Sequence, residues 1–133
     1  MAEVAQPKAK PSKTIVSHFP DRHVFMSFLT NNPGLIVVKF GASWCAPCKR
    51  IKPVVDAFFG TSPDEVVCCD IDVDESDDLF AFFKAKKMVS KIPTILCFAK
   101  GNHSFIPNDS VSGTAPEDLN AFFYRCGKIL QTV

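Results

Sequence analysis

Short apolar runs alternate along this chain with longer stretches in which apolar residues recur at helical spacing. The short runs are rich in β-branched residues and are bounded by turn residues, a pattern that indicates buried strands. A further strand over 104–106 and 110–112 should be interrupted by the Pro-Asn-Asp sequence at 107–109. The other predicted strands are 14–19, 35–40, 65–72 and 94–99.

The longer stretches predict four helices. The first should begin after Asp21, a good N-cap residue, and end at residues 31–34. The second should cover 47–60, directly after the strand at 35–40. This order predicts an α/β domain, in which about five strands form a central mixed sheet with helices on both faces.

The other two helices carry signals at their ends. Ser76 is the expected N-cap of the third helix, and residues 77–78 place two aspartates in its first turn. Its last turn should hold Lys84, Lys86 and Lys87, a charge distribution that favours the helix dipole. The fourth helix should follow residues 114–117 (Thr-Ala-Pro-Glu), a capping-box pattern with proline in the first turn.

Composition excludes several classes of protein. The 133 residues suffice for one domain, and 15 basic against 14 acidic side chains create no global field for nucleic acid or membrane. No apolar run approaches the ~20 residues of a membrane span. Neither a signal peptide nor a secreted cysteine framework is visible, so we expect a cytoplasmic protein. Residues 1–13, basic and without apolar periodicity, predict a flexible tail.

The sequence Cys45-Ala46-Pro47-Cys48 lies where a predicted strand ends and a predicted helix begins. The free N–H groups and the dipole of a helix N-terminus stabilise a thiolate on the first cysteine. Pro47 fits the first turn, where its missing N–H costs nothing. A thiolate with a second thiol beside it is suited to thiol–disulfide exchange.

Three other interpretations of this cysteine pair are weaker. Half of a zinc site would need a second CxxC pair, which the cysteines at 68, 69, 97 and 126 do not form. A structural disulfide would close too short a loop for much stabilisation. The third alternative is a pair of inert buried thiols. We expect that role instead for the other four cysteines, which lie on predicted strands and on the inward side of the last helix.

Residues 44–49, Trp-Cys-Ala-Pro-Cys-Lys, resemble the active site of the thioredoxin family, which usually has glycine where Ala46 stands. Residues 91–94, Lys-Ile-Pro-Thr, resemble that family's cis-proline loop. Pro53, residues 72–74 and the turn at 100–101 also match the family pattern. The resemblance implies a thioredoxin fold over a domain at 14–133. Its 35–40 strand should be central, with the 65–72 strand parallel on one side and the 94–99 strand antiparallel on the other.

The resemblance also implies a redox-active disulfide between Cys45 and Cys48. Cys45, expected to be the more exposed, is assigned as the nucleophile that forms a mixed disulfide with the target, and Cys48 as the residue that resolves it. The Ile92–Pro93 bond should be cis and lie opposite Cys45, where its backbone pairs with an extended substrate segment. Trp44 should be a partly exposed platform for the partner. The implied substrate-binding residues are Trp44, Ala46, Pro47, Lys91, Ile92, Pro93 and Gly113.

Lys39 stands where many thioredoxins carry a buried Asp that is thought to handle the proton of the second cysteine. Asp70 lies on the neighbouring predicted strand, where relatives often have Lys. We therefore predict a charge-exchanged ion pair beneath the active site, with Asp70 as the acceptor of the Cys48 proton and Lys39 keeping that carboxylate ionised. The alternative is that Lys39 reaches solvent past the sheet edge.

These features predict a thiol–disulfide oxidoreductase that reduces disulfides in client proteins and is recharged by a thioredoxin-reductase-type electron donor. We expect a monomer that uses no cofactor or metal and binds neither nucleic acid nor membrane. Basic residues at 49, 50, 52 and 91 indicate a preference for acidic partners, although a solvated helix face explains the first three equally well. Two alternatives remain: a dedicated relay to one client enzyme, and a redox-inactive binding or chaperone-like module on the same fold.

Overall fold

The computed structural model describes residues 13–132, which form a five-stranded mixed sheet between two layers of helices. Its strands are β1 Ile15–Val16, β2 Leu35–Gly41, β3 Val66–Asp72, β4 Thr94–Ala99 and β5 Asp109–Ser112. They lie in the order β1-β3-β2-β4-β5. β2 pairs in parallel with β3 and antiparallel with β4, which confirms the predicted central strand and both of its neighbours.

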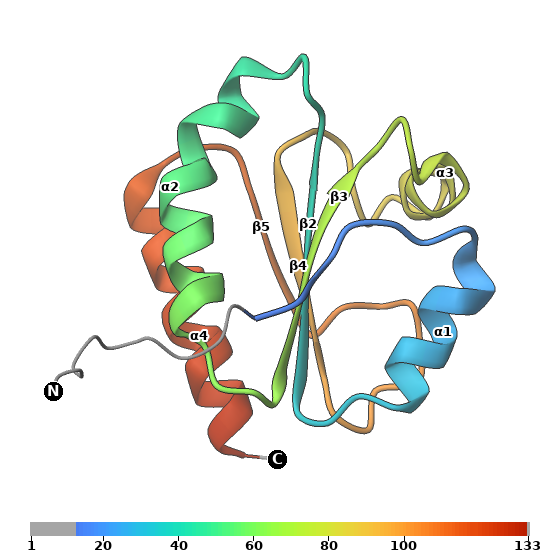
Figure 1. The fold of residues 1–133 in the computed structure, drawn as a ribbon, viewed down its shortest axis with the longest axis vertical. Coiled ribbons are helices and arrows are strands. Elements are labelled where there is room, and N and C mark those ends of the chain that lie inside the picture. Colours follow the sequence, from blue (N-terminus) through green and yellow to red (C-terminus); the bar gives the residue numbers. More distant parts are fainter. Residues whose placement is uncertain (1–12, 133) are drawn as a thin grey trace, which may run out of the picture.

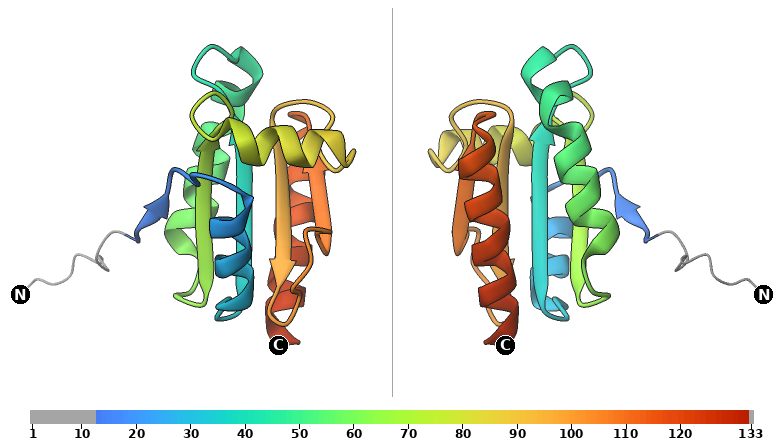
Figure 2. Two further views of the ribbon diagram at one scale, coloured as in Figure 1. Left: turned by 90° about the vertical axis from the view of Figure 1, so that its right-hand side faces the viewer. Right: turned by 90° about the vertical axis from the view of Figure 1, so that its left-hand side faces the viewer.

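Four helices in the described part of the chain cover the two faces of this sheet. They are α1 Arg22–Thr30, α2 Ala46–Thr61, α3 Asp77–Ala85 and α4 Pro116–Gln131. α2 and α4 lie on one face, and α1 and α3 lie on the other (Figures 1 and 2). The predicted α/β architecture, a mixed sheet with helices on both faces, is confirmed.

The side chains of β2 alternate between the two faces. Residues 36, 38 and 40 pack beneath α1 and α3, whereas Leu35 and Val37 pack beneath α2 and α4. Lys39 continues the second set, because successive side chains of a strand point to opposite faces. This register carries a lysine to the α2 side of the sheet, directly below the start of that helix.

A cluster of phenylalanine rings fills the core beneath α1 and α3. The Phe25 ring, which has no exposed surface, meets the rings of Phe19, Phe83 and Phe98 edge to face, with centroids 5.1, 5.7 and 5.3 Å away. Phe105, from the connection between β4 and β5, stacks against the same ring at 6.3 Å. Edge-to-face contacts add to the stabilisation that burial of each ring provides.

The structure corrects three predictions about helix ends. Ser76 does occupy the N-cap of α3, but its hydroxyl accepts a hydrogen bond from the Phe19 amide, 3.0 Å away, and makes no cap bond. α3 ends at Ala85, so only Lys84 lies in its last turn, while Lys87 leaves the helix with a φ of 62°. The 114–117 capping box does not form, because Ala115 is the N-cap of α4 and no side chain caps this helix.

Two strand predictions were too long. β1 covers only residues 15–16 of the predicted 14–19, because the chain then turns toward α3, where Phe19 bonds Ser76. β5 covers Asp109–Ser112, and the predicted strand at 104–106 is absent. There the Asn102 side chain donates to the Ile106 carbonyl and accepts from the Ser104 amide, which folds the segment into a compact loop.

Residues 1–12 of the expected tail lie outside the described residues, but Lys13 does not belong to a free tail. Its ammonium donates to the Ser62 hydroxyl at 2.7 Å and to the carbonyls of Pro63 and Val66 at 2.6 and 2.8 Å. It therefore satisfies carbonyl groups at the end of α2 and the start of β3, a favourable place for a cation.

Replacement of Phe25 by alanine should lower the free energy of unfolding by about 3–5 kcal/mol, because it opens a cavity among four rings. Urea unfolding followed by circular dichroism measures this loss. Tyr124→Ala is the control, since 66% of the Tyr124 surface is exposed, and it should change stability by less than about 0.5 kcal/mol. Equal losses in the two variants would contradict the assigned core.

Candidate active site

The cysteine pair lies at the junction of β2 and α2. β2 is buried along its whole length, and Cys45 is the N-cap of α2. The Cys48 amide donates a hydrogen bond to the Cys45 sulfur over 3.2 Å, and Pro47 lies in the first turn. The two cysteines are joined by a disulfide, with 5.3 Å between their Cα atoms. The same backbone N–H would meet a thiolate on Cys45 once this bond is reduced.

The two cysteines differ less in exposure than the sequence led us to expect. Cys45 is 5% exposed and Cys48 is 3% exposed, so both are buried. What distinguishes them is their place in the helix, because only the Cys45 sulfur accepts the hydrogen bond of an N-terminal amide. Any difference in their reactivity therefore depends on that amide rather than on access.

Trp44 forms the exposed ridge beside the disulfide. The ring has 67% of its surface exposed, and its indole nitrogen donates to an Asp74 carboxylate oxygen at 2.8 Å. Asp74 is held in turn, because its own amide donates to the Asp72 carboxylate over 2.8 Å. The sequence showed that residues 72–74 match the family pattern. Only the structure shows that the Asp74 carboxylate accepts a hydrogen bond from the Trp44 indole.

The predicted cis bond is present between Ile92 and Pro93. The Pro93 carbonyl accepts a hydrogen bond from the Gly113 amide at 3.0 Å, so the loop is joined to the end of β5. Gly113 has a φ of +91°, a conformation that favours glycine, and a side chain there would meet only the Lys91 ammonium. The space beside this loop is therefore open at Gly113, whereas Pro93 itself is buried.

Lys39 and Asp70 form the predicted ion pair. They are direct partners in the register of β2 and β3, and the Lys39 ammonium lies 3.6 Å from an Asp70 carboxylate oxygen. The lysine side chain is only 7% exposed, against 33% for the aspartate. The alternative of a solvent-directed Lys39 is therefore wrong, because the ammonium turns toward the strand beside it.

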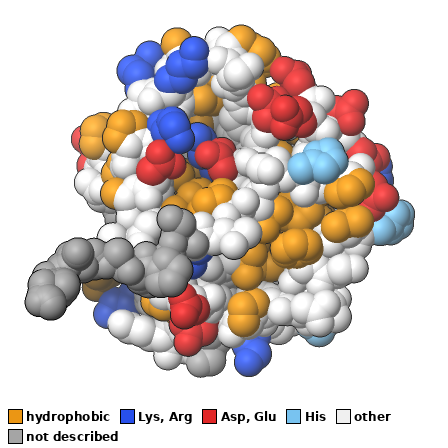
Figure 3. Space-filling model, viewed as in Figure 1, with side chains coloured by type: hydrophobic (Ala, Val, Ile, Leu, Met, Phe, Trp, Pro, Cys, Tyr) orange, Lys and Arg blue, Asp and Glu red, His pale blue; other side chains and the backbone are white. Residues whose placement is uncertain are grey.

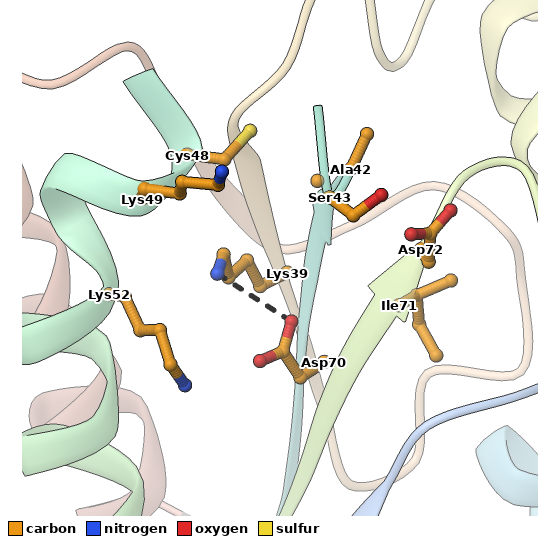
Figure 4. Close-up of a pocket in the computed structure, with 10 residues that line it drawn as sticks. Lys39, Ala42, Ser43, Cys48, Lys49, Lys52, Asp70, Ile71 and Asp72 are labelled. Carbon is orange, nitrogen blue, oxygen red and sulfur yellow. Dashed lines mark ion pairs between the residues drawn. The ribbon is translucent and has the colours of Figure 1, made fainter. Parts of the chain in front are cut away.

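An open pocket of about 530 Å³ lies beside this ion pair (Figure 4). Lys39 reaches into it from β2 and Asp70 from β3, below Cys48 and Lys49 of α2. A Cβ atom on Gly41 would lie 3.3 Å from the Cys48 sulfur and 3.6 Å from Lys39 Cε. Because Gly41 has no side chain, the Cys48 sulfur and the Lys39 side chain border the same pocket. The sequence did not indicate this role of Gly41.

The other four cysteines are buried, as predicted. Burial raises the pKa of Cys69, and burial outweighs the opposing effects of Ser62 and Lys13 to raise the pKa of Cys68. A hydrogen bond with Cys97, reinforced by burial, raises the pKa of Cys126. Cys68, Cys69 and Cys126 are therefore held as neutral thiols at neutral pH, a poor state for nucleophilic attack.

Two further searches covered the described residues alone. Between Lys13 and Thr132, no group of three or more His, Cys, Asp or Glu side chains is placed to hold a metal ion. None of the helices there is both long and apolar enough to cross a bilayer.

Comparison with known proteins gives sequence relatives that include chloroplast and bacterial thioredoxins. The chain is 30% identical to a chloroplast M-type thioredoxin of Zea mays over 82 residues, which are 62% of this chain but 44% of that protein. It is 35% identical to a thioredoxin of Staphylococcus saprophyticus over 85 residues, 64% of this chain and 74% of that one. The match thus spans just under half the length of the maize relative.

Solved structures and a family model complete the comparison. Thioredoxin of Fasciola hepatica superposes with a TM-score of 0.65 at 30% identity, covering 83% of this chain and 98% of that one. A Halobacterium salinarum thioredoxin variant, at 21% identity, shares the fold with a TM-score of 0.67 over 95% and 99% of the two chains. The predicted thioredoxin fold is confirmed. The family model named Thioredoxin matches residues 15–125, and this chain therefore belongs to the thioredoxin family.

Proposed function

We propose that this protein reduces disulfides in client proteins through the Cys45/Cys48 dithiol. The observation that carries the proposal is the Cys45–Cys48 disulfide at the N-cap of a helix, beside an exposed tryptophan and a cis-proline loop. A redox-inactive binding module would need none of this geometry. A dedicated relay to one client enzyme uses the same chemistry and differs only in the identity of the client.

The reaction has two exchange steps. The Cys45 thiolate attacks one sulfur of the client disulfide, so that a mixed disulfide forms and the other client sulfur leaves as a thiolate. The Cys48 thiolate then attacks the Cys45 sulfur, which closes the Cys45–Cys48 bond and releases the second client thiolate. The client gains two electrons and two protons, and the protein becomes oxidised.

An electron donor must reopen the Cys45–Cys48 bond after each cycle. We assign this task to a thioredoxin-reductase-type partner, which supplies two electrons through the same exposed face. We also propose that the protein is a monomer and that it is located in the cytoplasm. Chloroplast thioredoxins stand among the relatives, so this location remains a prediction.

The client segment is assigned to the surface around Cys45. Trp44, Ala46 and Pro47 would contact it on one side, and the loop at residues 91–93 together with Gly113 on the other. The cis-proline loop suits this role because the space beside it is open at Gly113. Extended backbone pairing of this kind accepts many sequences, as a general reductant requires.

Asp70 is assigned as the acceptor of the Cys48 proton, directly or through water in the cavity that both residues line. Lys39 is assigned as a positioning residue, because its ammonium lies 3.6 Å from the Asp70 carboxylate. Asp70 and Cys48 both line this cavity, so water within it would connect the carboxylate to the thiol.

Reduction of insulin with dithiothreitol as donor tests the proposed activity. The wild-type protein should accelerate the appearance of turbidity, and Cys45→Ser should abolish the acceleration because no nucleophile remains. Cys126→Ser, which changes a buried thiol, is the control and should retain activity. Turbidity that rises no faster with wild-type protein than with dithiothreitol alone would favour the binding module.

Brief alkylation of the reduced protein near neutral pH should label Cys45 well before Cys48. The physical reason is the Cys48 amide, which stabilises a thiolate only on Cys45. Mass mapping after iodoacetamide treatment measures the order of labelling. Faster labelling of Cys48 or Cys126 would remove Cys45 as the nucleophile.

Asp70→Asn should slow the resolution of a mixed disulfide about tenfold or more while leaving the alkylation rate of Cys45 nearly unchanged, as loss of a general base does. Rapid-quench kinetics on a Cys45-linked mixed disulfide measures this step. Asp56→Asn is the matched control, since it removes a carboxylate that pairs with Lys52 at 2.9 Å. Equal resolution rates in the wild type and in Asp70→Asn would leave solvent as the base.

A further inference from the structure

Three basic side chains near the disulfide have no hydrogen-bond or ion-pair partner within residues 13–132. They are Lys49 and Arg50, exposed in the first turns of α2, and Lys91, exposed just before the cis bond. The neighbouring cations are paired, Lys39 with Asp70 and Lys52 with Asp56. The charge that an approaching molecule meets on this side is therefore positive, although the whole chain carries only +1.

Lys91 is the best placed of the three. A Cβ atom built on Gly113 would have only one neighbour within 4 Å, the Lys91 ammonium at 3.8 Å. Gly113 is bonded to Pro93 through its amide, so the ammonium lies beside the backbone surface assigned to the client. Any side chain of a client segment that lies along this surface must pass close to that charge.

The backbone that carries Lys91 is held in place. The Lys91 carbonyl accepts a hydrogen bond from the Thr94 hydroxyl at 2.6 Å, and that hydroxyl also lies 2.7 Å from the Ser112 hydroxyl. Thr94 itself is 1% exposed. The loop position of Lys91 is thus held by the buried Thr94 of β4, which in turn contacts the exposed Ser112 of β5, while the long Lys91 side chain remains in solvent.

The opposite flank of the site has the other sign of charge. The Asp74 carboxylate already holds Trp44, and beyond it Glu75 and Asp77 are exposed toward α3. Figure 3 shows basic side chains gathered over the upper end of α2 and acidic ones across the upper right of the same view. Charge therefore changes sign across the reactive disulfide, which gives an approaching client a preferred orientation.

We propose that Lys91, supported by Lys49 and Arg50, selects client disulfides that are flanked by Asp or Glu. The inference rests on the proposed reductase function and adds the chemical class of its substrate. Charges at an exposed rim act mainly on the rate of encounter, and each pair contributes modestly. An acidic flank should therefore raise kcat/KM about three- to tenfold over a neutral one at low ionic strength.

Three synthetic peptides test the inference. They contain the same disulfide and differ only in the two residues beside one cysteine, which are Glu, Gln or Lys. The pre-reduced wild-type protein should reduce them in the order Glu, Gln, Lys. The differences in rate between the peptides should shrink at about 0.5 M salt, because salt then screens the interaction between charges that are more than a few ångströms apart.

The variants are compared by the ratio of rates for the Glu and Lys peptides, which cancels any general loss of activity or folding. Lys91→Glu should reverse the order of the peptides, and Lys91→Met should flatten it. Lys100→Glu is the matched control, because it makes the same change in net charge at a residue that lines a different cavity with Gly34 and Glu65. It should keep the wild-type order and rate.

Two outcomes separate this inference from the proposed function. If the wild type reduces all three peptides at equal rates, or if Lys91→Glu keeps the wild-type order, selection by Lys91 is wrong while the reductase function stands. If the wild type reduces none of the three, the proposed function itself fails. A reversal that occurs equally in Lys100→Glu would assign the effect to net charge and overturn the role of Lys91.

Discussion

The pairing of β2 with both of its neighbours is the constraint on which the rest of the structure depends. β2 is buried along all seven residues, with β3 parallel on one side and β4 antiparallel on the other. A strand held in this way cannot shift by one residue without exchanging its two faces. The end of β2 therefore fixes where α2 begins, and with it the position of Cys45 at the helix N-cap.

The same register explains why a charged pair is tolerated beneath the disulfide. Lys39 follows Leu35 and Val37 on the α2 side of the sheet, where an isolated ammonium would be costly to bury. The parallel pairing of β2 with β3 sets Asp70 directly beside it and supplies the opposite charge. Gly41 and the cavity then leave room between this pair and Cys48. One strand register thus determines both the core packing and the electrostatic surroundings of the second cysteine.

The surface around Cys45 combines a backbone that is held by hydrogen bonds with exposed basic side chains. Trp44 is tied to Asp74, and the cis-proline loop is bonded to the end of β5. The unpaired ammonium and guanidinium groups stand on this rigid frame but are themselves solvated. Such an arrangement would suit the proposed reductase, in which extended segments of many sequences bind and clients of one charge are favoured.

The resemblance to the thioredoxin family predicted the Lys39–Asp70 ion pair, whereas the sequence pattern by itself determined the order of elements and the helix start beside Cys45. It could do so because β-branched runs, helical spacing and N-cap chemistry act between near neighbours in the chain. Only the tertiary structure decided how Ser76, Asp74 and Gly41 are used, and that residues 104–106 leave the sheet. Their partners lie far away in sequence or depend on which hydrogen bonds compete locally. The burial of Cys45, which is 5% exposed against 3% for Cys48, also differs from the expected exposed nucleophile, because burial depends on what the rest of the fold packs over a residue.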